Sequence, residues 1–374
     1  MEIRRVGIHH VVMRLREPFE TSFGKIVDRP CLIFEVEERG GEVGWGEAPV
    51  DDGPWYSYET VDTALSVAAR FLVPELLRAE EVDGPLGFLR LARRVRGHRM
   101  AKAGIEMALW DLAARLEGRP LYRLLGGVRS RVECGISVGI IGDAAALLRS
   151  VLRYLERGYR RVKIKIKPGW DVEPVDLLRR ELGHIPLQVD ANAAYSLETS
   201  GPLLELDSRD LLMIEQPLHY DDLAEHAELQ SKLRTPICLD ESIKSLHDAK
   251  AALKLKSCRV INIKPARVGG LNEVRAIHDL AESFGVGVWI GGMLETGIGR
   301  AFLVASATLP NVRYPSDIGE SSRYWYEDIV EPPWELRSDG TMEMPERSGI
   351  GVEVLEDRLR KHVKGSLELR RSGG

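Results

Sequence analysis

The chain has 374 residues, enough for a large hydrophobic core, and this length favours about two domains. Its net charge of −5, with acids and bases mixed along the chain, argues against the basic surface that nucleic-acid binding requires. The N-terminal segment is interrupted by charges every few residues, and no other segment is apolar and long enough for a signal peptide or a membrane span.

Two further features of composition concern the environment of the protein. The cysteines lie far apart within apolar runs and form no CxxC pair, which is typical of buried thiols in a cytoplasmic protein. There are only three glutamines and four asparagines beside abundant arginine and glutamate, a bias found in proteins from thermophiles. We therefore expect a cytoplasmic enzyme from a heat-adapted organism.

The first part of the chain combines strands with helices. Residues 3–15 and 30–48 alternate in polarity, and the second segment contains a Gly-Gly turn, so we expect a meander of strands. Residues 58–77 and 97–118 carry apolar side chains three and four positions apart, which predicts helices. Residues 1–130 are therefore interpreted as an α+β domain.

From there the pattern changes to short apolar strands that alternate with amphipathic helices. The strand segments are VECGISVGI at 132, RVKIKI at 161, PLQVD at 186, LLMIEQ at 211, PICLDE at 236, RVINIK at 259, VGVWIGG at 286 and NVRYPSD at 311. Eight such strands with helices between them predict a parallel β/α barrel over residues 131–320. Residues 321–374 return to irregular strands and a short helix, and we expect them to complete the first domain.

Charged residues recur at the ends of five consecutive barrel strands. Lys165, Asp190, Glu215, Asp240 and Lys264 are separated by 25, 25, 25 and 24 residues. Because the carboxyl ends of barrel strands meet at one mouth, these side chains converge. The three acids lie on neighbouring strands, and carboxylates without a nearby His or Cys cluster favour Mg²⁺ or Mn²⁺ over zinc.

The two lysines of the set lie four strands apart in the ring and therefore face each other across the mouth. In the segment RVKIKIKPGWD, Lys163, Lys165 and Lys167 share one face of a strand, while Ile164 and Ile166 point to the helices. A neighbouring lysine and a metal ion lower the pKa of Lys165, so that it can act as a base; Lys167 is interpreted as a solvated loop residue. A base and a divalent ion together suit removal of the proton next to a carboxylate, because the ion stabilises the resulting enediolate.

The segments KIKIKPGWD, QVDAN, IEQPL, CLDES, NIKPARVGG and GGMLETG resemble the enolase superfamily, whose sites combine a lysine or histidine base with Mg²⁺. Within its muconate-lactonizing-enzyme-like subgroup, the chain is most similar to the family of o-succinylbenzoate synthases and N-acylamino acid racemases. This resemblance implies a modified (β/α)7β barrel with an α+β capping domain. It also implies Asp190, Glu215 and Asp240 as metal ligands and Lys165 and Lys264 as acid/base residues.

The resemblance assigns roles to further residues. Lys163 corresponds to the group that holds the substrate carboxylate or tunes Lys165. PFETSFG corresponds to a mobile loop that closes over the substrate, and Asp51 and Asp52 introduce acids near the expected pocket entrance, where relatives have apolar residues. The substrate-lining positions are Phe19, Phe23, Ser137, Met293 and Leu294, and the residues that support the ligands and lysines are Asn192, Glu241 and Arg267.

The resemblance leaves the reaction open between two outcomes. In a dehydration, Lys165 removes the α-proton and then assists departure of a hydroxyl; in a racemisation, Lys165 and Lys264 exchange a proton from opposite faces. Arg267 is similar to an arginine of the racemising members. The dehydration would place the protein in menaquinone biosynthesis.

Other interpretations are weaker. A dipeptide epimerase or a muconate-type cycloisomerase is the enzymatic alternative, although the chain lacks the DxD pair of the epimerases. Sugar-acid dehydratases use a histidine after the seventh strand, where this chain has Gly-Gly-Met. A non-catalytic binding or structural protein would have no reason to keep all five charged groups. The expected partner is a small carboxylate, and the resemblance implies a homo-oligomer.

Overall fold

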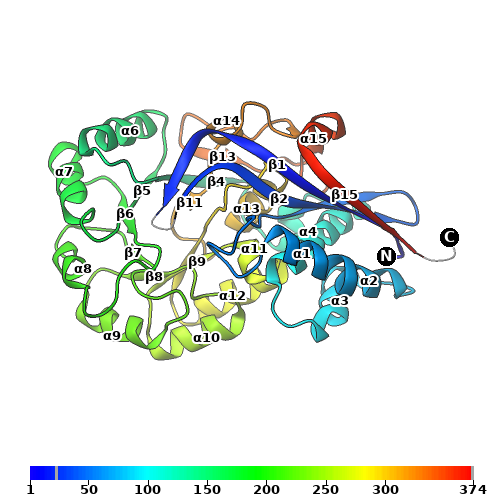
Figure 1. Ribbon diagram of the computed structural model, residues 1–374, viewed down its shortest axis with the longest axis horizontal. Coiled ribbons are helices and arrows are strands. Elements are labelled where there is room, and N and C mark those ends of the chain that lie inside the picture. Colours follow the sequence, from blue (N-terminus) through cyan, green and yellow to red (C-terminus); the bar gives the residue numbers. More distant parts are fainter. Residues whose placement is uncertain (22–23, 372–374) are drawn as a thin grey trace.

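A four-stranded antiparallel sheet forms the base of the capping domain (Figure 1). The structure is a computed structural model that describes residues 1–21 and 24–371. The strand order is β15-β1-β2-β3, so the last strand of the chain pairs with the first. The strands are β1 (Ile3–Thr21), β2 (Gly24–Glu38), β3 (Val43–Ala48) and β15 (Val363–Arg370).

The hairpin of β1 and β2 is longer than the sequence predicted. Residues 18–21, expected as part of a loop, continue β1, and Phe19 pairs with Ile26 on β2. A shift of register between Arg14 and Phe19 separates this outer part from the main sheet. The hairpin therefore runs from the capping domain across the barrel (Figure 1).

Helices cover one face of this sheet, and α4 makes the closest approach. A Cβ atom on Gly46 would lie 2.1 Å from the carbonyl oxygen of Gly104, and one on Gly44 would lie 2.2 Å from that of Ala108. These two glycines of β3 therefore let the α4 backbone pack directly against the sheet. The helical segments are α1 (Val61–Val67), the π-helical turn Ala68–Leu72, α2 (Val73–Arg78), α3 (Gly84–Leu91), the 3₁₀ turn Ala92–Arg94, α4 (Arg99–Leu116) and α5 (Leu121–Leu125).

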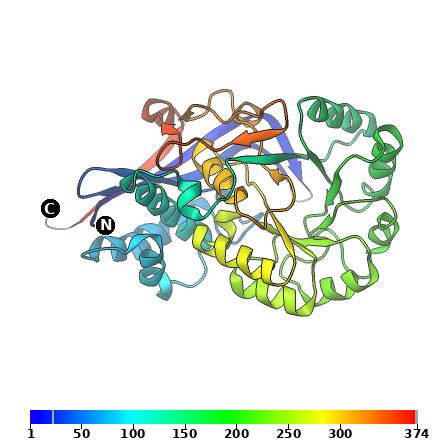
Figure 2. The same cartoon turned by 180° about the vertical axis from the view of Figure 1, so that it is seen from behind.

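The second unit is a parallel barrel surrounded by helices, best seen from behind in Figure 2. The hydrogen-bonded order is β10-β9-β8-β7-β6-β5-β4-β11, and a single parallel bridge between Val288 and Val312 lies where the ring closes. The barrel strands are β4 (Arg131–Val138), β5 (Arg161–Lys165), β6 (Leu187–Asp190), β7 (Ile214–Glu215), β8 (Ile237–Leu239), β9 (Val260–Ile263), β10 (Gly287–Ile290) and β11 (Ser316–Asp317). The predicted fold class, a barrel with a capping domain, is confirmed.

Helices connect the barrel strands; most of them bury one face, whereas α11 and α13 are buried along their whole length. The capping aspartate of α6, Asp143, accepts hydrogen bonds from the N–H groups of Ala145 and Ala146, which satisfies donors at the helix start. The helices are α6 (Ala144–Glu156), α7 (Val172–Leu182), α8 (Gly201–Leu206), α9 (Ala224–Lys232), α10 (Leu246–Leu255), α11 (Pro265–Val268), α12 (Leu271–Ser283) and α13 (Gly297–Ala307). No helix of the described residues has the length and apolar character to cross a membrane.

The C-terminal part crosses from the barrel to the capping domain. β13 pairs antiparallel with β4, β12 pairs with β14, and α15 leads into β15 at the edge of the capping sheet. The division of the chain after residues 130 and 320 stays a prediction. The elements of this part are α14 (Ser321–Tyr324), β12 (Val330–Glu331), β13 (Thr341–Glu343), β14 (Glu353–Val354) and α15 (Glu356–His362).

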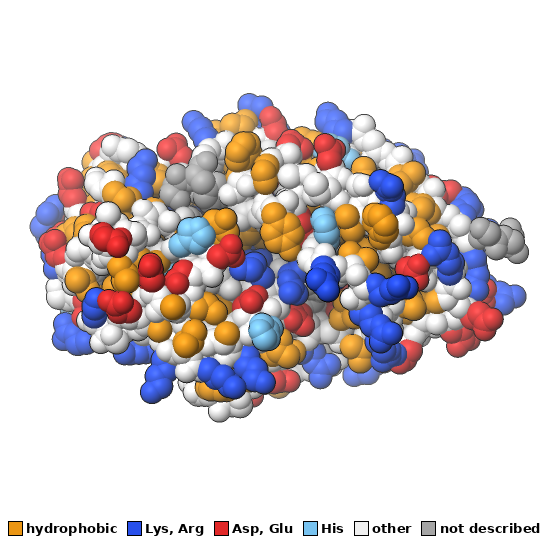
Figure 3. Space-filling model, turned by 60° about the horizontal axis from the view of Figure 1, so that its bottom comes forward, with side chains coloured by type: hydrophobic (Ala, Val, Ile, Leu, Met, Phe, Trp, Pro, Cys, Tyr) orange, Lys and Arg blue, Asp and Glu red, His pale blue; other side chains and the backbone are white. Residues whose placement is uncertain are grey.

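In Figure 3, acidic and basic side chains are interspersed over the barrel side of the face shown, as the mixed sequence suggested.

Two buried carboxylates of the capping domain bind the starts of barrel helices. Glu106 on α4 accepts hydrogen bonds from the backbone N–H groups of Leu271 and Asn272 at the start of α12, at 2.8 and 3.0 Å. Glu47 on β3 accepts from the N–H and hydroxyl groups of Thr296 before α13. Both acids are almost completely buried, so these bonds fix the orientation of the two units where their surfaces meet.

We expect Glu106→Ala to lower the free energy of unfolding by about 3 kcal/mol, because it leaves buried N–H donors without an acceptor. Urea unfolding measures this change. The control is Glu117→Ala, which removes an exposed acid just after the same helix and should change stability by less than about 0.5 kcal/mol. Equal effects of the two substitutions would contradict the prediction.

Candidate active site

Strand β5 places three cations on the inner face of the barrel. Arg161, Lys163 and Lys165 alternate with the fully buried Val162 and Ile164, which pack toward the helices. The strand ends at Lys165, so Lys167 lies beyond it and is exposed. The alternation that the sequence showed therefore supplies two inward lysines and one inward arginine.

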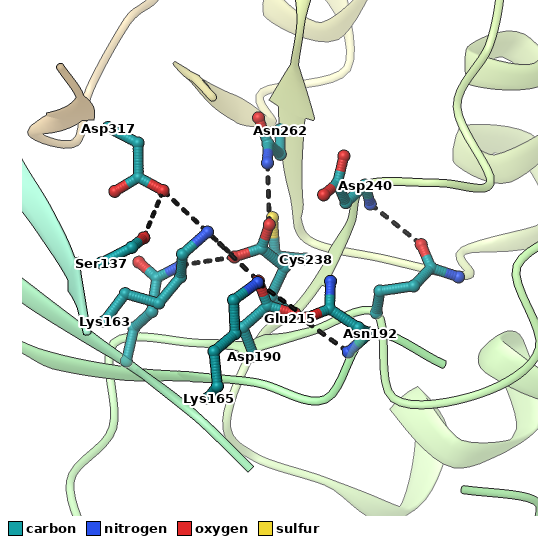
Figure 4. A network of polar contacts seen from close by, with 12 residues as sticks. Ser137, Lys163, Lys165, Asp190, Asn192, Glu215, Cys238, Asp240, Asn262 and Asp317 are labelled. Carbon is teal, nitrogen blue, oxygen red and sulfur yellow. Dashed lines mark hydrogen bonds and ion pairs between the residues drawn. The ribbon is translucent and has the colours of Figure 1, made fainter. Parts of the chain in front are cut away.

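Lys163 lies among three acids (Figure 4). Its ammonium group is 2.7 Å from Asp317 Oδ2, 2.9 Å from Glu215 Oε2 and 3.2 Å from Asp190 Oδ2. Burial alone would lower the pKa of Lys163, but the three carboxylates outweigh it and raise the pKa above its usual range. Lys163 is therefore a fixed positive charge in this arrangement.

Lys165 has fewer acidic neighbours. Its ammonium group donates to Asp190 Oδ2 and Asn192 Oδ1, both at 2.7 Å. Asn192 has a positive φ of 44°, a conformation that asparagine tolerates better than most residues. Its amide group donates to Glu241 Oε1 at 3.0 Å, so Glu241 orients the side chain that contacts Lys165.

Lys264 follows β9 on the other side of the ring. Its ammonium group lies 2.7 Å from Asp240 Oδ2 and donates to the hydroxyl of Tyr56 at 3.0 Å. Arg267 also binds Asp240, and its Nε donates to the carbonyl of Ile243 at 2.8 Å. Asp240 thus joins Lys264 and Arg267, with Tyr56 of the capping domain over the lysine.

The predicted lysines and most of the predicted substrate-lining residues meet at one cavity between the barrel mouth and the capping domain. Lys163, Lys165 and Lys264 all line it, and Lys165 and Lys264 come from strands that are four places apart in the ring. The lining also includes Phe19, Ser137, Met293, Leu294 and Asn192. Phe23 lies outside the described residues. Glu241 and Arg267 instead line a neighbouring surface groove.

The two acids near the pocket entrance differ in position. Asp51 lines the cavity and forms an ion pair with Arg29, whereas Asp52 is exposed and is not part of the lining. Arg29 is buried and donates to the carbonyl of Met293 at 3.0 Å, so it connects β2 to the loop after β10. The sequence did not determine whether Asp51 or Asp52 faces the pocket, and the structure shows that Asp51 does.

The three predicted ligand acids lie on neighbouring strands and are completely buried. Asp190 and Glu215 are paired residues of β6 and β7, and Asp240 directly follows β8. In this structure their charges are balanced by Lys163, Lys165, Lys264 and Arg267.

The donor set of these acids suits a hard divalent cation, since all the donors are carboxylate oxygens. The oxygens are turned toward the lysines and the arginine, and no group of three or more His, Cys, Asp or Glu in the described residues is arranged around one point. The three acids therefore have the donor atoms that a divalent ion prefers. In this structure, their oxygens instead form ion pairs with the lysines and Arg267.

Several residues of this site were missed by reasoning from sequence. Asp317 is the last residue of the predicted eighth strand and carried the same strand-end signal as the ligand acids. Arg161 opens the alternating run of β5. Tyr56 and Arg29 had no signal in the sequence, because only the docking of the capping domain brings them to the barrel.

Known proteins resemble this chain in both sequence and architecture. Residues 3–126 match the N-terminal domain of the mandelate racemase / muconate lactonizing enzyme family, and residues 146–358 match the enolase C-terminal domain-like family. The chain belongs to the enolase superfamily. It is 46% identical to an o-succinylbenzoate synthase from Geobacillus stearothermophilus, over 97% of this chain and 96% of that protein.

Two further relatives agree with this assignment. An N-succinylamino acid racemase from Amycolatopsis sp is 45% identical, over 96% of this chain and 97% of that protein. The crystal structure of an enolase-superfamily member from Listeria innocua superimposes with a TM-score of 0.96 at 37% identity and covers 100% of both chains. The resemblance that the motifs suggested is confirmed at the level of superfamily and family.

We expect Arg29→Met to lower the free energy of unfolding by about 2 kcal/mol or more, because Arg29 is a buried donor that also neutralises Asp51. Thermal or urea unfolding measures the effect. Arg14→Met is the matched control on the same hairpin: Arg14 forms an exposed pair with Asp28, 3.3 Å apart, and such pairs contribute little. A loss as large in the control would contradict the assigned role of Arg29.

Proposed function

We propose that this enzyme removes the proton next to the carboxylate of a small molecule and passes through an enediolate. The observation that carries the proposal is the placement of Lys165 and Lys264 on opposite walls of one cavity, each beside a buried carboxylate. With relatives named o-succinylbenzoate synthase and N-succinylamino acid racemase, we propose one or both of these activities.

We propose that Asp190, Glu215 and Asp240 hold one divalent cation, Mg²⁺ or Mn²⁺. Bound there, the ion would stabilise the negative charge on the enediolate oxygens. Lys165 and Lys264 would give up these carboxylate partners if the acids held a metal ion, since each lysine contacts one of the three. Their amines then become available to exchange protons with the substrate.

The two reactions use the lysines differently. In racemisation, one lysine takes the α-proton from one face of the substrate and the other lysine, in its protonated form, returns a proton to the opposite face. In dehydration, Lys165 takes the α-proton and then donates it to the departing hydroxyl, which leaves as water. In both, Lys163 holds the substrate carboxylate, and Lys264 lies on the far side of the reacting carbon.

The remaining residues are proposed to position these groups and the substrate. Asn192 orients Lys165, with Glu241 behind it, and Arg267 holds Asp240. The contact of Arg267 with the acid that pairs with Lys264 supports competence for racemisation. The walls for the substrate are assigned to Phe19, Phe23, Ser137, Met293 and Leu294.

The residues of the eighth strand support a dipeptide epimerase less than they support the two activities proposed above. In β11 the acid Asp317 is followed by Ile318 and Gly319, and its carboxylate is already bound by Lys163, Ser137 and Arg161. A muconate-type cycloisomerase has weaker support from sequence: a chloromuconate cycloisomerase is 29% identical to this chain, whereas the o-succinylbenzoate synthase is 46% identical. We also propose a cytoplasmic homo-oligomer whose partner is its carboxylate substrate, with menaquinone biosynthesis as the pathway for the dehydration.

The activity is tested in D₂O with Mg²⁺, using an N-succinyl L-amino acid and the cyclohexadiene precursor of o-succinylbenzoate separately. We expect Lys264→Ala to abolish racemisation while Lys165 still exchanges the α-proton on its own face, a loss of about 10² or more in racemisation rate. Polarimetry and NMR of the α-proton follow the two events. Undiminished racemisation by this variant would refute the two-lysine mechanism.

Metal binding is tested without any substrate. We expect Mg²⁺ to raise the melting temperature of the wild type, because a ligand that binds only the folded state stabilises it. Asp240→Asn should lose most of this shift, and Asp221→Asn, in an exposed ion pair with Lys244, should keep it. An identical shift in both variants would exclude Asp240 from the site, and no shift in the wild type would favour a non-catalytic protein.

A further inference from the structure

Asp317 is a partly buried acid at the substrate cavity that belongs to none of the groups assigned so far. Its Oδ2 accepts hydrogen bonds from Lys163 Nζ and Ser137 Oγ, both at 2.7 Å, and its Oδ1 lies 2.8 Å from Arg161 Nη2 (Figure 4 shows the first two). The three partners lie on β4, which is next to β11 in the ring, and on β5, which is next to β4. Asp317 therefore ties the first, second and eighth barrel strands together inside the mouth.

The backbone of β4 leaves space for the side chain of Arg161. Asp317 is paired with Gly135, and Gly135 is paired with Arg161, so the three residues form one row across β11, β4 and β5. A Cβ atom on Gly135 would lie 2.5 Å from Arg161 Cζ. The glycine thus lets the guanidinium group cross the middle strand and reach Asp317.

Arg161 is itself held in place on several sides. Its side chain is fully buried, its Nη2 donates to the carbonyl of Pro315 at 2.9 Å, and its guanidinium carbon lies 4.8 Å from the ring centre of Trp289. Burial alone would raise the pKa of Asp317, but Arg161 and Lys163 lower it below its usual range. Asp317 is therefore an anion whose counter-ion, Arg161, is buried and held by contacts of its own.

The two lysines of β5 differ in their acid partners, because Lys163 contacts Asp317 and Lys165 does not. Lys165 contacts Asp190 as its only acid among the described residues, and Asp190 is a proposed metal ligand. Lys163 contacts Asp190 and Glu215, but it also contacts Asp317, which lies outside the proposed ligand set. When the ligand acids are engaged elsewhere, Lys163 still keeps Asp317 as an acid partner, whereas Lys165 keeps no acid partner among the described residues and contacts the amide oxygen of Asn192.

We propose that Asp317 is a positioning residue that holds the ammonium group of Lys163 at the wall of the substrate cavity, through a contact in which the metal-binding acids take no part. The inference rests on the proposed function, because it assigns to Lys163 the binding of the substrate carboxylate. Asp317 acts through Lys163, and Arg161 keeps Asp317 in place. Its loss weakens substrate binding and leaves the proton exchange by Lys165 and Lys264 largely intact.

The test is Asp317→Asn, which keeps the shape of the side chain and removes its charge. With an N-succinyl L-amino acid and Mg²⁺ in D₂O, we expect KM for α-proton exchange to rise about tenfold or more while kcat changes by less than about threefold. Asp339→Asn, an exposed aspartate on the loop before β13, is the control and should leave KM unchanged. An unchanged KM in Asp317→Asn would overturn the proposal.

A double-mutant cycle separates positioning from a general structural effect. Lys163→Met should also raise KM, and adding Asp317→Asn to Lys163→Met should then have no further effect, because the group through which Asp317 acts is gone. If the two effects on KM multiply instead, Asp317 does not act through Lys163, and the proposal is wrong.

A second variant keeps the test valid should Asp317→Asn not fold, since this substitution leaves Arg161 buried without its counter-ion. Arg161→Met combined with Asp317→Asn removes both charges, and we expect it to fold and to show the same rise in KM. An unchanged KM in this folded variant would also overturn the proposal.

Failure of the proposed function is distinguishable from failure of this inference. If the wild type exchanges no proton of either test substrate, the proposed function is wrong. The positioning role of Asp317 is then tested by a crystal structure of the folded variant. Displacement of the Lys163 ammonium group from the cavity wall, relative to the wild type, would support positioning. An unmoved ammonium group would contradict it.

Discussion

Burial of charge inside the barrel is the constraint on which the rest of this structure depends. Isolated charges are too costly to bury, so each inward cation of β5 must meet an acid from another strand. The parallel register provides the meeting points: Lys165 is paired with Asp190, and Asp190 with Glu215. The same pairing that allows these groups to be buried brings potential metal ligands and potential bases into one place.

The ion pairs also bear on the proposed metal site. In this structure the counter-ions of the three acids are the lysines and Arg267. Under the proposed function, a divalent ion and the lysines would compete for the same carboxylates, which would link metal binding to the availability of the two amines. Asp317 is set apart from this competition, because Arg161 and not a metal ion is its second partner.

The capping domain is part of the site and not only a cover for it. Glu106 and Glu47 bind the starts of α12 and α13, which follow the loops after β9 and β10. Tyr56 and Arg29 reach from the capping domain to Lys264 and to the carbonyl of Met293. The buried hydrogen bonds that join the two units and the contacts that complete the cavity therefore lie in the same interface.

The sequence by itself determined the repeat and its chemistry. Short strands separated by helices can form a parallel barrel, and charges at a spacing of 25 residues then fall at corresponding strand ends, so Lys165, Asp190, Glu215, Asp240 and Lys264 could be named without a structure. The alternation in β5 likewise predicted the inward lysines, because side chains of a strand point to opposite faces. Asp317 was missed although its signal was the same, since its partners Arg161 and Ser137 are recognisable only when the eighth strand closes on the first. The tertiary structure alone decided that Asp51 and not Asp52 lines the cavity, and that Tyr56 lies over Lys264. These contacts join residues far apart in the chain, and their geometry depends on how the surfaces of the two units pack, which no local pattern encodes.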